Sequence, residues 1–398
     1  MEITSKKICL KTNNSMKIIY LYPALDTVGG ADRVITEKAN YFADHCGYDV
    51  YIVTAHQNNA PIYFPLSAKV KHIDLAVDFN KQYGQPLWKR MFIYIKLLRQ
   101  YKKKVRETLF SVRPDFTITT ISRDIDFLHT INDGSIKIAE AHISKPFIRN
   151  LHRLAQKSMI YQIIGKIWTR KLDNAIKKMD ALVVLTERDA KKWEKIKKAT
   201  VIPNSLPFYP EASSTCETKK IISVGRLDEQ KGYDMLIDAW ETVHKQHPDW
   251  KIIIYGNGEL HDILKDAIIQ KHLENSFILH EPVKDIMNQY LDSSIYVMSS
   301  RFEGFGMVLA EAMACGVPCI SFDCPYGPSD IIKDFVDGLM VEYGNVVQLA
   351  QKISELIEQE AIRKRMGQQA KLNIKRYSRE NIMQKWCDLF EQLKKERQ

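Results

Sequence analysis

Short apolar segments alternate with segments of helical spacing in two successive runs along this chain. The first run opens with KIIYLYP at residues 17–23, and the second opens with KIISVGRL at residues 220–227. Apolar stretches of this length are typical of strands that are buried on both faces of a parallel sheet covered by helices. The sequence therefore predicts an α/β protein made of two Rossmann-like domains that face each other across a cleft.

A break in this alternation separates the two runs. Residues 201–219 contain three prolines and a cluster of serines and threonines, which is typical of an interdomain linker. A chain of 398 residues is also too long for one ordinary core. We expect a flexible leader at 1–15, an N-terminal domain at 16–203, a C-terminal domain at 204–376, and a final helix at 377–398 that packs back on the N-terminal domain.

Charge is divided unevenly between the two halves. Residues 1–200 carry 35 Lys and Arg against 19 Asp and Glu, a net charge of +16, whereas residues 201–398 carry 23 against 29, a net charge of −6. This asymmetry indicates that the halves meet different partners, and nucleic acid, an anionic membrane and an anionic substrate all fit the basic half. No apolar run approaches the roughly 20 residues that span a bilayer, and the first fifteen residues lack the apolar core of a secretory signal.

The seven cysteines are odd in number and mostly scattered, so we interpret them as reduced thiols of a cytoplasmic protein. Cys315, Cys319 and Cys324 are close enough in sequence to suggest zinc. They alternate with apolar residues and have no His nearby, which favours small core residues over metal ligands.

Two glutamates stand eight positions apart in SSRFEGFGMVLAEAMACGVPCISFD, residues 299–323. Glu303 falls in the loop after a predicted strand, and Glu311 lies one turn into a helix that begins near Met307. The free N–H groups of a helix start, approached through Gly306, bind anions, whereas carboxylates accept hydrogen bonds from hydroxyl groups. This spacing favours a polyhydroxyl ligand such as a sugar nucleotide. The alternative is a pair of ordinary helix acids, one solvated and one stabilised by the helix dipole.

Two further motifs follow predicted strands. In GRLDEQKG, Arg226 and Lys231 flank a turn before a helix, where they could hold a diphosphate or simply be solvated. After the first strand, Gly29 and Gly30 would let the backbone approach a ligand closely. They do not form a GxGxxG pattern, so a nicotinamide dinucleotide is disfavoured.

These motifs together resemble glycosyltransferase family 4, the retaining transferases with the GT-B fold, over residues 16–396. The resemblance rests on GGADR, GRLDEQKGYDMLIDAW, IIIYGNGE and SSRFEGFGMVLAEAMACGVPCISFDCPYGPSDII in this order. It implies transfer of a hexose or N-acetylhexosamine from a UDP-sugar to a hydroxyl of a glycan acceptor, lipid-linked, in the assembly of surface polysaccharide or oligosaccharide.

The resemblance also implies roles for individual residues. Arg226 and Lys231 would bind the diphosphate, and Glu311 would bind the ribose hydroxyls. Glu303 and the backbone of Phe305–Met307 would bind the donor sugar.

For the first half, the resemblance places Gly30, next to Gly29, near the acceptor and the leaving group. It places His142, at the end of KIAEAH, near the donor sugar or its phosphate, although a structural role is the alternative. Asp124 and Asp126 form a DxD pattern that could bind a metal. GT-B enzymes normally offset diphosphate charge with cations, so no metal and no other cofactor is expected.

Two basic segments add an expectation about membranes. One is WKRMFIYIKLLRQYKKKVR at 88–106, and in the other Lys145, Arg149, Arg153 and Lys157 recur every four residues. Both are explained either by amphipathic helices with solvated cations or by docking to an anionic leaflet, which would place the enzyme peripherally on the cytoplasmic membrane face.

Two other functions fit parts of this pattern. One is a GT-B UDP-N-acetylglucosamine epimerase, which would need no acceptor. The other is a non-catalytic basic protein that binds membrane or nucleic acid. The complete set of Glu303, Glu311, Arg226 and Lys231 argues against the second, and nucleic acid is not an expected partner.

Overall fold

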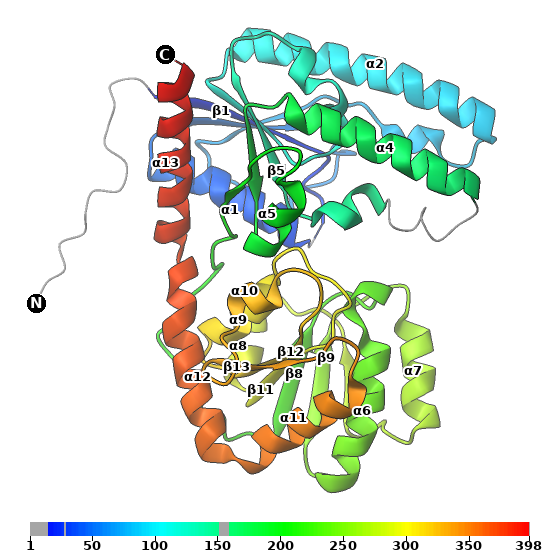
Figure 1. The fold of residues 1–398 in the computed structure, drawn as a ribbon, viewed down its shortest axis with the longest axis vertical. Helices are drawn as coiled ribbons and strands as arrows, with labels where there is room; N and C mark the ends of the chain where they lie inside the picture. The colour runs from blue at the N-terminus through cyan, green and yellow to red at the C-terminus, as the bar shows by residue number, and fades with distance from the viewer. Residues whose placement is uncertain (1–14, 28, 151–158, 398) are drawn as a thin grey trace, which may run out of the picture. The chain divides into compact units, whose positions relative to one another are not determined.

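The computed structural model describes three stretches of the chain: residues 15–27, 29–150 and 159–397. The chain forms two compact units (Figure 1). Unit 1 consists of Met1–Pro203 and Glu380–Gln398, and unit 2 consists of Asn204–Arg379. In both units the apolar segments form strands of a parallel sheet, because a strand covered by helices on both faces must be apolar on both.

Unit 1 has seven parallel strands within its described residues, in the order β3-β2-β1-β4-β5-β6-β7. The strands are β1 (Lys17–Tyr22), β2 (Asp49–Thr54), β3 (Lys71–Asp74), β4 (Phe116–Thr119), β5 (Ile136–Ala141), β6 (Ala181–Val184) and β7 (Thr200–Val201). The direction of strand addition reverses between β1 and β4. In doubly wound sheets, ligands bind at such a switch point, outside the carboxyl ends of the strands.

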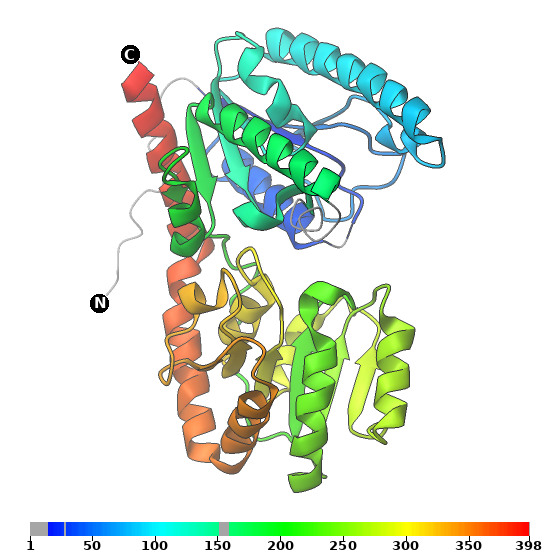
Figure 2. The same cartoon turned by 45° about the vertical axis from the view of Figure 1, so that its right-hand side comes forward.

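Helices cover both faces of this sheet (Figures 1 and 2). They are α1 (Gly30–Asp44), α2 (Leu87–Val112), α4 (Met159–Lys177), α5 (Glu187–Trp193) and α13 (Arg379–Arg397), with the 3-10 helices η1 (Phe79–Gln82), η2 (Arg123–Asp126), η3 (Leu128–Thr130) and η4 (Lys145–Asn150). Helices α2, α4 and α5 share a core with Ile19 and Leu21 on one face. On the other face, the ring centroid of Phe390 in α13 lies 5.5 Å from that of Phe42 in α1 and 4.5 Å from that of Phe116 in β4. The last helix therefore completes the core of the first unit.

Unit 2 repeats this plan with six strands in the order β10-β9-β8-β11-β12-β13. The strands are β8 (Lys220–Val224), β9 (Lys251–Tyr255), β10 (Phe277–His280), β11 (Ile295–Met298), β12 (Cys319–Phe322) and β13 (Gly338–Val341). The helices are α6 (Tyr233–Gln246), α7 (His261–Gln270), α8 (Ile286–Leu291), α9 (Met307–Ala314), α10 (Pro328–Ile331), α11 (Val346–Glu358) and α12 (Glu360–Ile374), with η5 (Glu229–Lys231) and η6 (Lys375–Tyr377). The switch point of this sheet lies between β8 and β11.

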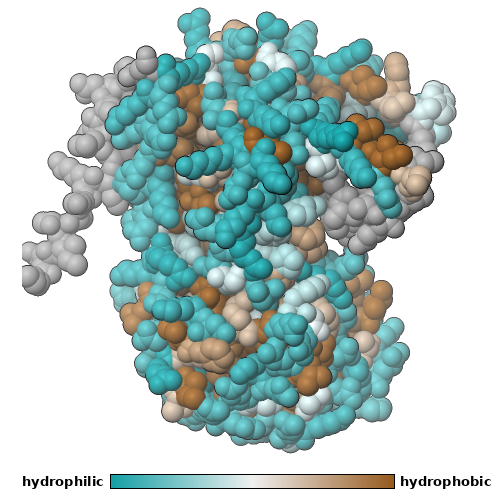
Figure 3. All heavy atoms as spheres, viewed as in Figure 1, coloured by the Kyte–Doolittle hydropathy of each residue, from teal (hydrophilic) through white to brown (hydrophobic). Residues whose placement is uncertain are grey.

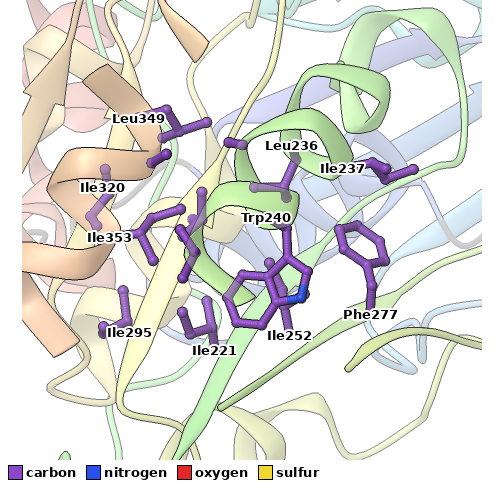
Figure 4. Close-up of a cluster of buried hydrophobic side chains, with 14 of the residues drawn as sticks. Ile221, Leu236, Ile237, Trp240, Ile252, Phe277, Ile295, Ile320, Leu349 and Ile353 are labelled. Carbon is purple, nitrogen blue, oxygen red and sulfur yellow. The ribbon is translucent and has the colours of Figure 1, made fainter. Parts of the chain in front are cut away.

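The core of unit 2 is built around Trp240 of α6, which is fully buried. Its indole lies among Ile221 and Ile252 of the strands, with Leu349 of α11 nearby (Figure 4). The indole N–H donates to the hydroxyl of Ser276 at 3.2 Å, so the one polar atom of the side chain is satisfied inside the core. This packing gives the switch-point loops a rigid support.

Three observed strands were not predicted from the sequence. Strand β3 lies at the edge of its sheet, and its sequence KHID has no apolar run. Strand β7 is two residues long and falls partly within the predicted linker, and β13 lies where only helices were expected. Short strands carry too few residues for a period to be read, and they form because a neighbouring strand offers hydrogen-bonding groups.

The second basic segment was expected to form an amphipathic helix with solvated or membrane-facing cations. Lys145 does not follow this expectation. This residue opens the 3-10 helix η4, and its ammonium lies 3.1 Å from Asp173 and 4.5 Å from the ring centroid of Trp193. Lys145 is therefore turned toward the protein. Arg153 and Lys157 lie outside the described residues, as does the side chain of Arg149.

Candidate active site

The switch point of unit 2 brings together two loops that contain most of the predicted site. One loop follows β8 and holds Arg226 and Lys231, and the other follows β11 and holds Glu303. Because β8 and β11 are neighbours at the switch point, the two loops lie next to each other at the carboxyl ends of the strands, where ligands bind in doubly wound sheets. The sequence predicted the position of these loops correctly.

The two loops are fastened to each other by their backbones. Gly232 has φ +63°, and a Cβ atom placed on it would lie 2.2 Å from the carbonyl oxygen of Ser299. Only glycine permits this approach. The N–H of Arg301 donates to the carbonyl of Gln230 at 2.7 Å, and the Arg301 guanidinium donates to both carboxylate oxygens of Asp234 at 2.9 and 2.6 Å. The site is therefore preorganised.

Lys231 and Glu303 contact each other directly within this site. The Lys231 Nζ donates to the Glu303 Oε1 at 2.7 Å, and the Ser300 hydroxyl donates to the same oxygen at 2.7 Å. The two side chains are only 14% and 8% exposed, so the ion pair is largely withdrawn from water. The sequence assigned these residues to different parts of a ligand. Their contact places the two predicted parts of the binding site next to each other.

Arg226 is held differently. Its side chain is 72% exposed, lies 3.1 Å from Asp228, and donates to Gln230 at 3.5 Å. Exposed pairs of this kind contribute little to stability. Arg226 can therefore turn toward a ligand without leaving a buried charge unpaired.

Helix α9 contains Glu311 and has an uncapped start. Gly306 precedes the helix with φ +99° and no side-chain cap. Glu311 is 7% exposed and accepts a hydrogen bond from the Tyr290 hydroxyl at 3.2 Å, so it is not a solvated helix acid. Phe305 is buried, with its ring centroid 5.2 Å from that of Tyr377, so its predicted role can involve only its backbone.

In unit 1, Gly29 and Gly30 stand at the uncapped start of α1. A Cβ atom on Gly30 would meet nothing within 4 Å, so the space above this helix start is open within unit 1. Asp32 holds the preceding loop by accepting hydrogen bonds from the Tyr22 hydroxyl at 2.6 Å and from the Thr27 N–H at 3.0 Å. The helix start is thus exposed and firmly placed.

His142 follows β5 and contacts a buried ion pair that sequence reasoning missed. Glu140 is buried at the end of β5, where it forms an ion pair with buried Lys38 of α1. The Oε1 of Glu140 also lies 3.2 Å from the Nε2 of His142. Burial alone would raise the pKa of Glu140, but Lys38 and His142 lower it to about 2. A glutamate inside an otherwise apolar strand, IKIAEA, was the available signal.

The two aspartates of the DxD pattern, Asp124 and Asp126, make different contacts in the structure. Asp124 accepts a hydrogen bond from the Tyr101 hydroxyl at 3.4 Å, whereas Asp126 pairs with Lys171 at 3.2 Å. Across the part of the chain that the structure describes, no three His, Cys, Asp or Glu side chains are grouped as metal ligands. The two aspartates thus have separate protein partners.

The three closely spaced cysteines are buried. The Sγ of Cys319 lies 3.8 Å from the carbonyl oxygen of Leu309, and burial raises the pKa of this thiol. Burial also raises the pKa of the Cys315 thiol, to about 12. All three lie in the core, as the sequence predicted.

Known proteins are similar to this chain in sequence and in fold. Residues 211–373 match the family described as glycosyl transferases group 1. The amylovoran biosynthesis glycosyltransferase AmsD of Erwinia amylovora is 30% identical over 94% of this chain and 99% of its own. The GalNAc-α-(1→4)-GalNAc-α-(1→3)-diNAcBac-PP-undecaprenol α-1,4-N-acetyl-D-galactosaminyltransferase of Campylobacter jejuni is 26% identical over 95% of this chain and 99% of its own. The structure of S. aureus TarM in complex with fondaparinux, α-GlcNAc-glycerol and UDP has a TM-score of 0.74 at 17% identity, covering 94% of this chain and 100% of TarM.

The two doubly wound units and their switch-point loops thus define a GT-B protein, and TarM shares this fold. The chain belongs to the group 1 glycosyltransferases, and it is a sugar-transferring enzyme.

Proposed function

We propose that the enzyme moves a hexose or N-acetylhexosamine from a UDP-sugar to a hydroxyl of a glycan acceptor, with retention of configuration, as in glycosyltransferase family 4. The Lys231–Glu303 ion pair, next to the uncapped start of α9, carries this proposal. An ammonium, free helix N–H groups and carboxylates suit a ligand that joins an anionic diphosphate to hydroxyl-rich rings. TarM, crystallised with UDP, supports uridine as the nucleoside.

In this proposal, different residues of unit 2 bind different parts of the donor. Arg226 and Lys231 hold the diphosphate, and Glu311, fixed by Tyr290, accepts from the ribose hydroxyls. Glu303 accepts from a sugar hydroxyl near the reacting carbon.

The acceptor hydroxyl attacks from the face that the diphosphate leaves, through an oxocarbenium-like state, and the departing diphosphate takes the proton. Lys231 and the N–H groups at the start of α9 stabilise the charge of the leaving group. The proposal includes no metal in this step, because Lys231 and Arg226 would offset the charge of the diphosphate.

The acceptor in this proposal is a lipid-linked glycan of surface polysaccharide or oligosaccharide assembly. The name of the C. jejuni relative includes an undecaprenol-linked acceptor, and AmsD acts in amylovoran biosynthesis. Among the described helices, none is both long and apolar enough to cross a bilayer. In this proposal the enzyme reaches its lipid-linked acceptor as a peripheral protein on the cytoplasmic face of the membrane.

The first turns of α2 and α4 support such peripheral association. In α2, Trp88, Met91 and Phe92 are 73%, 64% and 70% exposed, and Lys89 and Arg90 lie between them. In α4, the exposed apolar residues are Met159, Ile163, Ile164, Ile167 and Trp168. Figure 3 shows hydrophobic side chains over these helices within a mainly hydrophilic surface. Apolar side chains interleaved with cations suit the interface of an anionic leaflet.

Vesicle co-sedimentation tests this association. The double variant Trp88→Ser/Phe92→Ser should bind vesicles that contain phosphatidylglycerol about 10- to 100-fold more weakly than the unmodified enzyme, because two apolar side chains no longer enter the leaflet. The control is Ile263→Ser, which removes a 64% exposed apolar residue from α7 of unit 2. Equal binding by all three proteins would show that α2 is not part of a membrane-binding surface.

Transfer itself is tested with a panel of UDP-, GDP- and ADP-sugars, with and without lipid-diphosphate-linked glycan acceptors. We expect glycosylated acceptor from one UDP-sugar and an α-linkage from an α-linked donor. Conversion of UDP-N-acetylglucosamine without any acceptor would instead identify an epimerase.

A further inference from the structure

A cluster of three ionisable residues lies inside unit 1, at the carboxyl end of β5. Lys38 and Glu140 have side chains only 3% and 1% exposed, and that of His142 is 9% exposed. A single carboxylate oxygen, Oε1 of Glu140, contacts both the ammonium of Lys38 and the Nε2 of His142. Glu140 and His142 are two residues apart at the end of β5, and Lys38 reaches Glu140 from α1.

Stability does not explain this buried charge. Withdrawing two charges from water is costly, and apolar residues of similar volume are often as stable or more stable in such places. Glu140 nevertheless stays ionised, because Lys38 and His142 lower its pKa to about 2 against the opposing effect of burial. Lys38 lies 4.3 Å from the ring centroid of Trp386 in α13 and 5.7 Å from that of Tyr20. The carboxylate is therefore anionic and fixed in position.

The effect of this carboxylate falls on the imidazole ring. An anionic oxygen 3.2 Å from Nε2 favours the tautomer with its proton on that nitrogen and attracts this edge of the ring. The contact lacks the alignment of a hydrogen bond, so its effect is mainly electrostatic. With Nε2 facing Glu140, Nδ1 is the ring nitrogen that remains for a ligand.

We infer that Glu140 and Lys38 are positioning residues for His142. Lys38 keeps Glu140 ionised, and Glu140 holds the ring of His142 so that its Nδ1 is available to a ligand. This inference rests on the proposed function and on the family resemblance, which implies that His142 contacts the donor sugar or its phosphate. Neither Lys38 nor Glu140 touches the substrate.

The test uses neutral substitutions that keep the shape of the cluster. Lys38→Met and Glu140→Gln each leave one buried charge without its partner, so each should lower the melting temperature. The double variant Lys38→Met/Glu140→Gln removes both charges and should melt near the unmodified enzyme. Its transfer kcat should stay about 10- to 100-fold lower, less than the roughly 10⁴-fold that a His-orienting carboxylate contributes where the His is the general base.

A second buried pair on the same strand gives a matched control. Lys137, at the start of β5, forms an ion pair with Asp133, and the two side chains are 7% and 0% exposed. The double variant Asp133→Asn/Lys137→Met should leave kcat unchanged, since it removes an equivalent pair that does not contact His142.

A double-mutant cycle then tests whether Glu140 acts through His142. His142→Ala should reduce kcat strongly in the unmodified enzyme and by less than about threefold in the Lys38→Met/Glu140→Gln background. Full activity of Lys38→Met/Glu140→Gln, or losses that simply multiply, would overturn the inference while leaving the proposed function intact.

If the unmodified enzyme transfers no sugar, the proposed function is wrong, and the ring resonances of His142 still decide the inference. In ¹⁵N spectra they should show the proton of the neutral ring on Nε2 in the unmodified enzyme and in Asp133→Asn/Lys137→Met, and a weaker preference for Nε2 in Lys38→Met/Glu140→Gln. The same preference in all three proteins would overturn the inference.

Discussion

Replacing Lys231 by Met should both destabilise unit 2 and weaken UDP binding, whereas replacing Arg226 by Met should only weaken UDP binding. The Lys231–Glu303 pair is 14% and 8% exposed with a 2.7 Å contact. Removing one partner of such a pair costs about 3–5 kcal/mol, and we expect about 3 kcal/mol because Ser300 still donates to Glu303. Arg226 is 72% exposed, so its loss should cost less than about 1 kcal/mol.

The two substitutions should weaken UDP binding by similar amounts. A charge-assisted hydrogen bond to the diphosphate contributes about 1.5–3 kcal/mol, so each variant should bind UDP roughly 10- to 150-fold more weakly. Calorimetric titration measures this loss. For a unit of this size, a loss of about 3 kcal/mol lowers the melting temperature by about 6–12 °C, which scanning calorimetry detects readily.

A third variant separates the two effects. Lys231→Met/Glu303→Gln leaves no buried charge, so it should recover most of the melting temperature without recovering UDP affinity. Equal melting temperatures for Lys231→Met and Arg226→Met would refute the description of Lys231–Glu303 as a buried pair. Unchanged UDP affinity in both would refute their role in binding the diphosphate.

Three further outcomes are expected. The pKa of Glu140 is lowered from 4.5 to about 2, so its contribution to stability is complete above about pH 4.5 and is lost as the pH falls toward 2; acid should therefore reduce the free energy of unfolding more steeply in the unmodified enzyme than in Lys38→Met/Glu140→Gln. Glu311→Gln should weaken UDP itself, whereas Glu303→Gln should slow turnover and leave UDP affinity nearly unchanged, which dissociation constants and transfer rates compare directly. Transfer should persist in excess EDTA, and a complete loss reversed by Mn²⁺ would show that a metal is required.

The sequence predicted the sheets and the position of the site because both depend on local patterns. Continuous apolar runs identify β1, β2 and β8 without knowledge of their neighbours. In a doubly wound sheet, the loops that follow such strands lie at one edge. Arg226 and Glu303 could therefore be assigned to the same edge of one sheet.

Contacts between distant residues could not be predicted in this way. Lys231 and Glu303 are 72 positions apart, and Lys38 and Glu140 are 102 positions apart. Both pairs form because the order of the strands brings their elements together. The order of the strands cannot be predicted from the pattern of any single segment. Lys145 shows the same limit. Its spacing with the following cations favoured an amphipathic helix, but in the structure Lys145 packs on Trp193 and opens a short 3-10 helix.

The discontinuity of unit 1 has a consequence for the order in which the protein folds during its synthesis. Helix α13 buries Trp386 and Phe390 in unit 1, yet the ribosome makes it only after the roughly 180 residues of Asn204–Arg379, a delay of about 10–35 s. Unit 2 is continuous and can fold as soon as it emerges. Until α13 arrives, Phe42 and Phe116 lack their partner, so the nascent first unit offers a hydrophobic face to chaperones or to neighbouring chains.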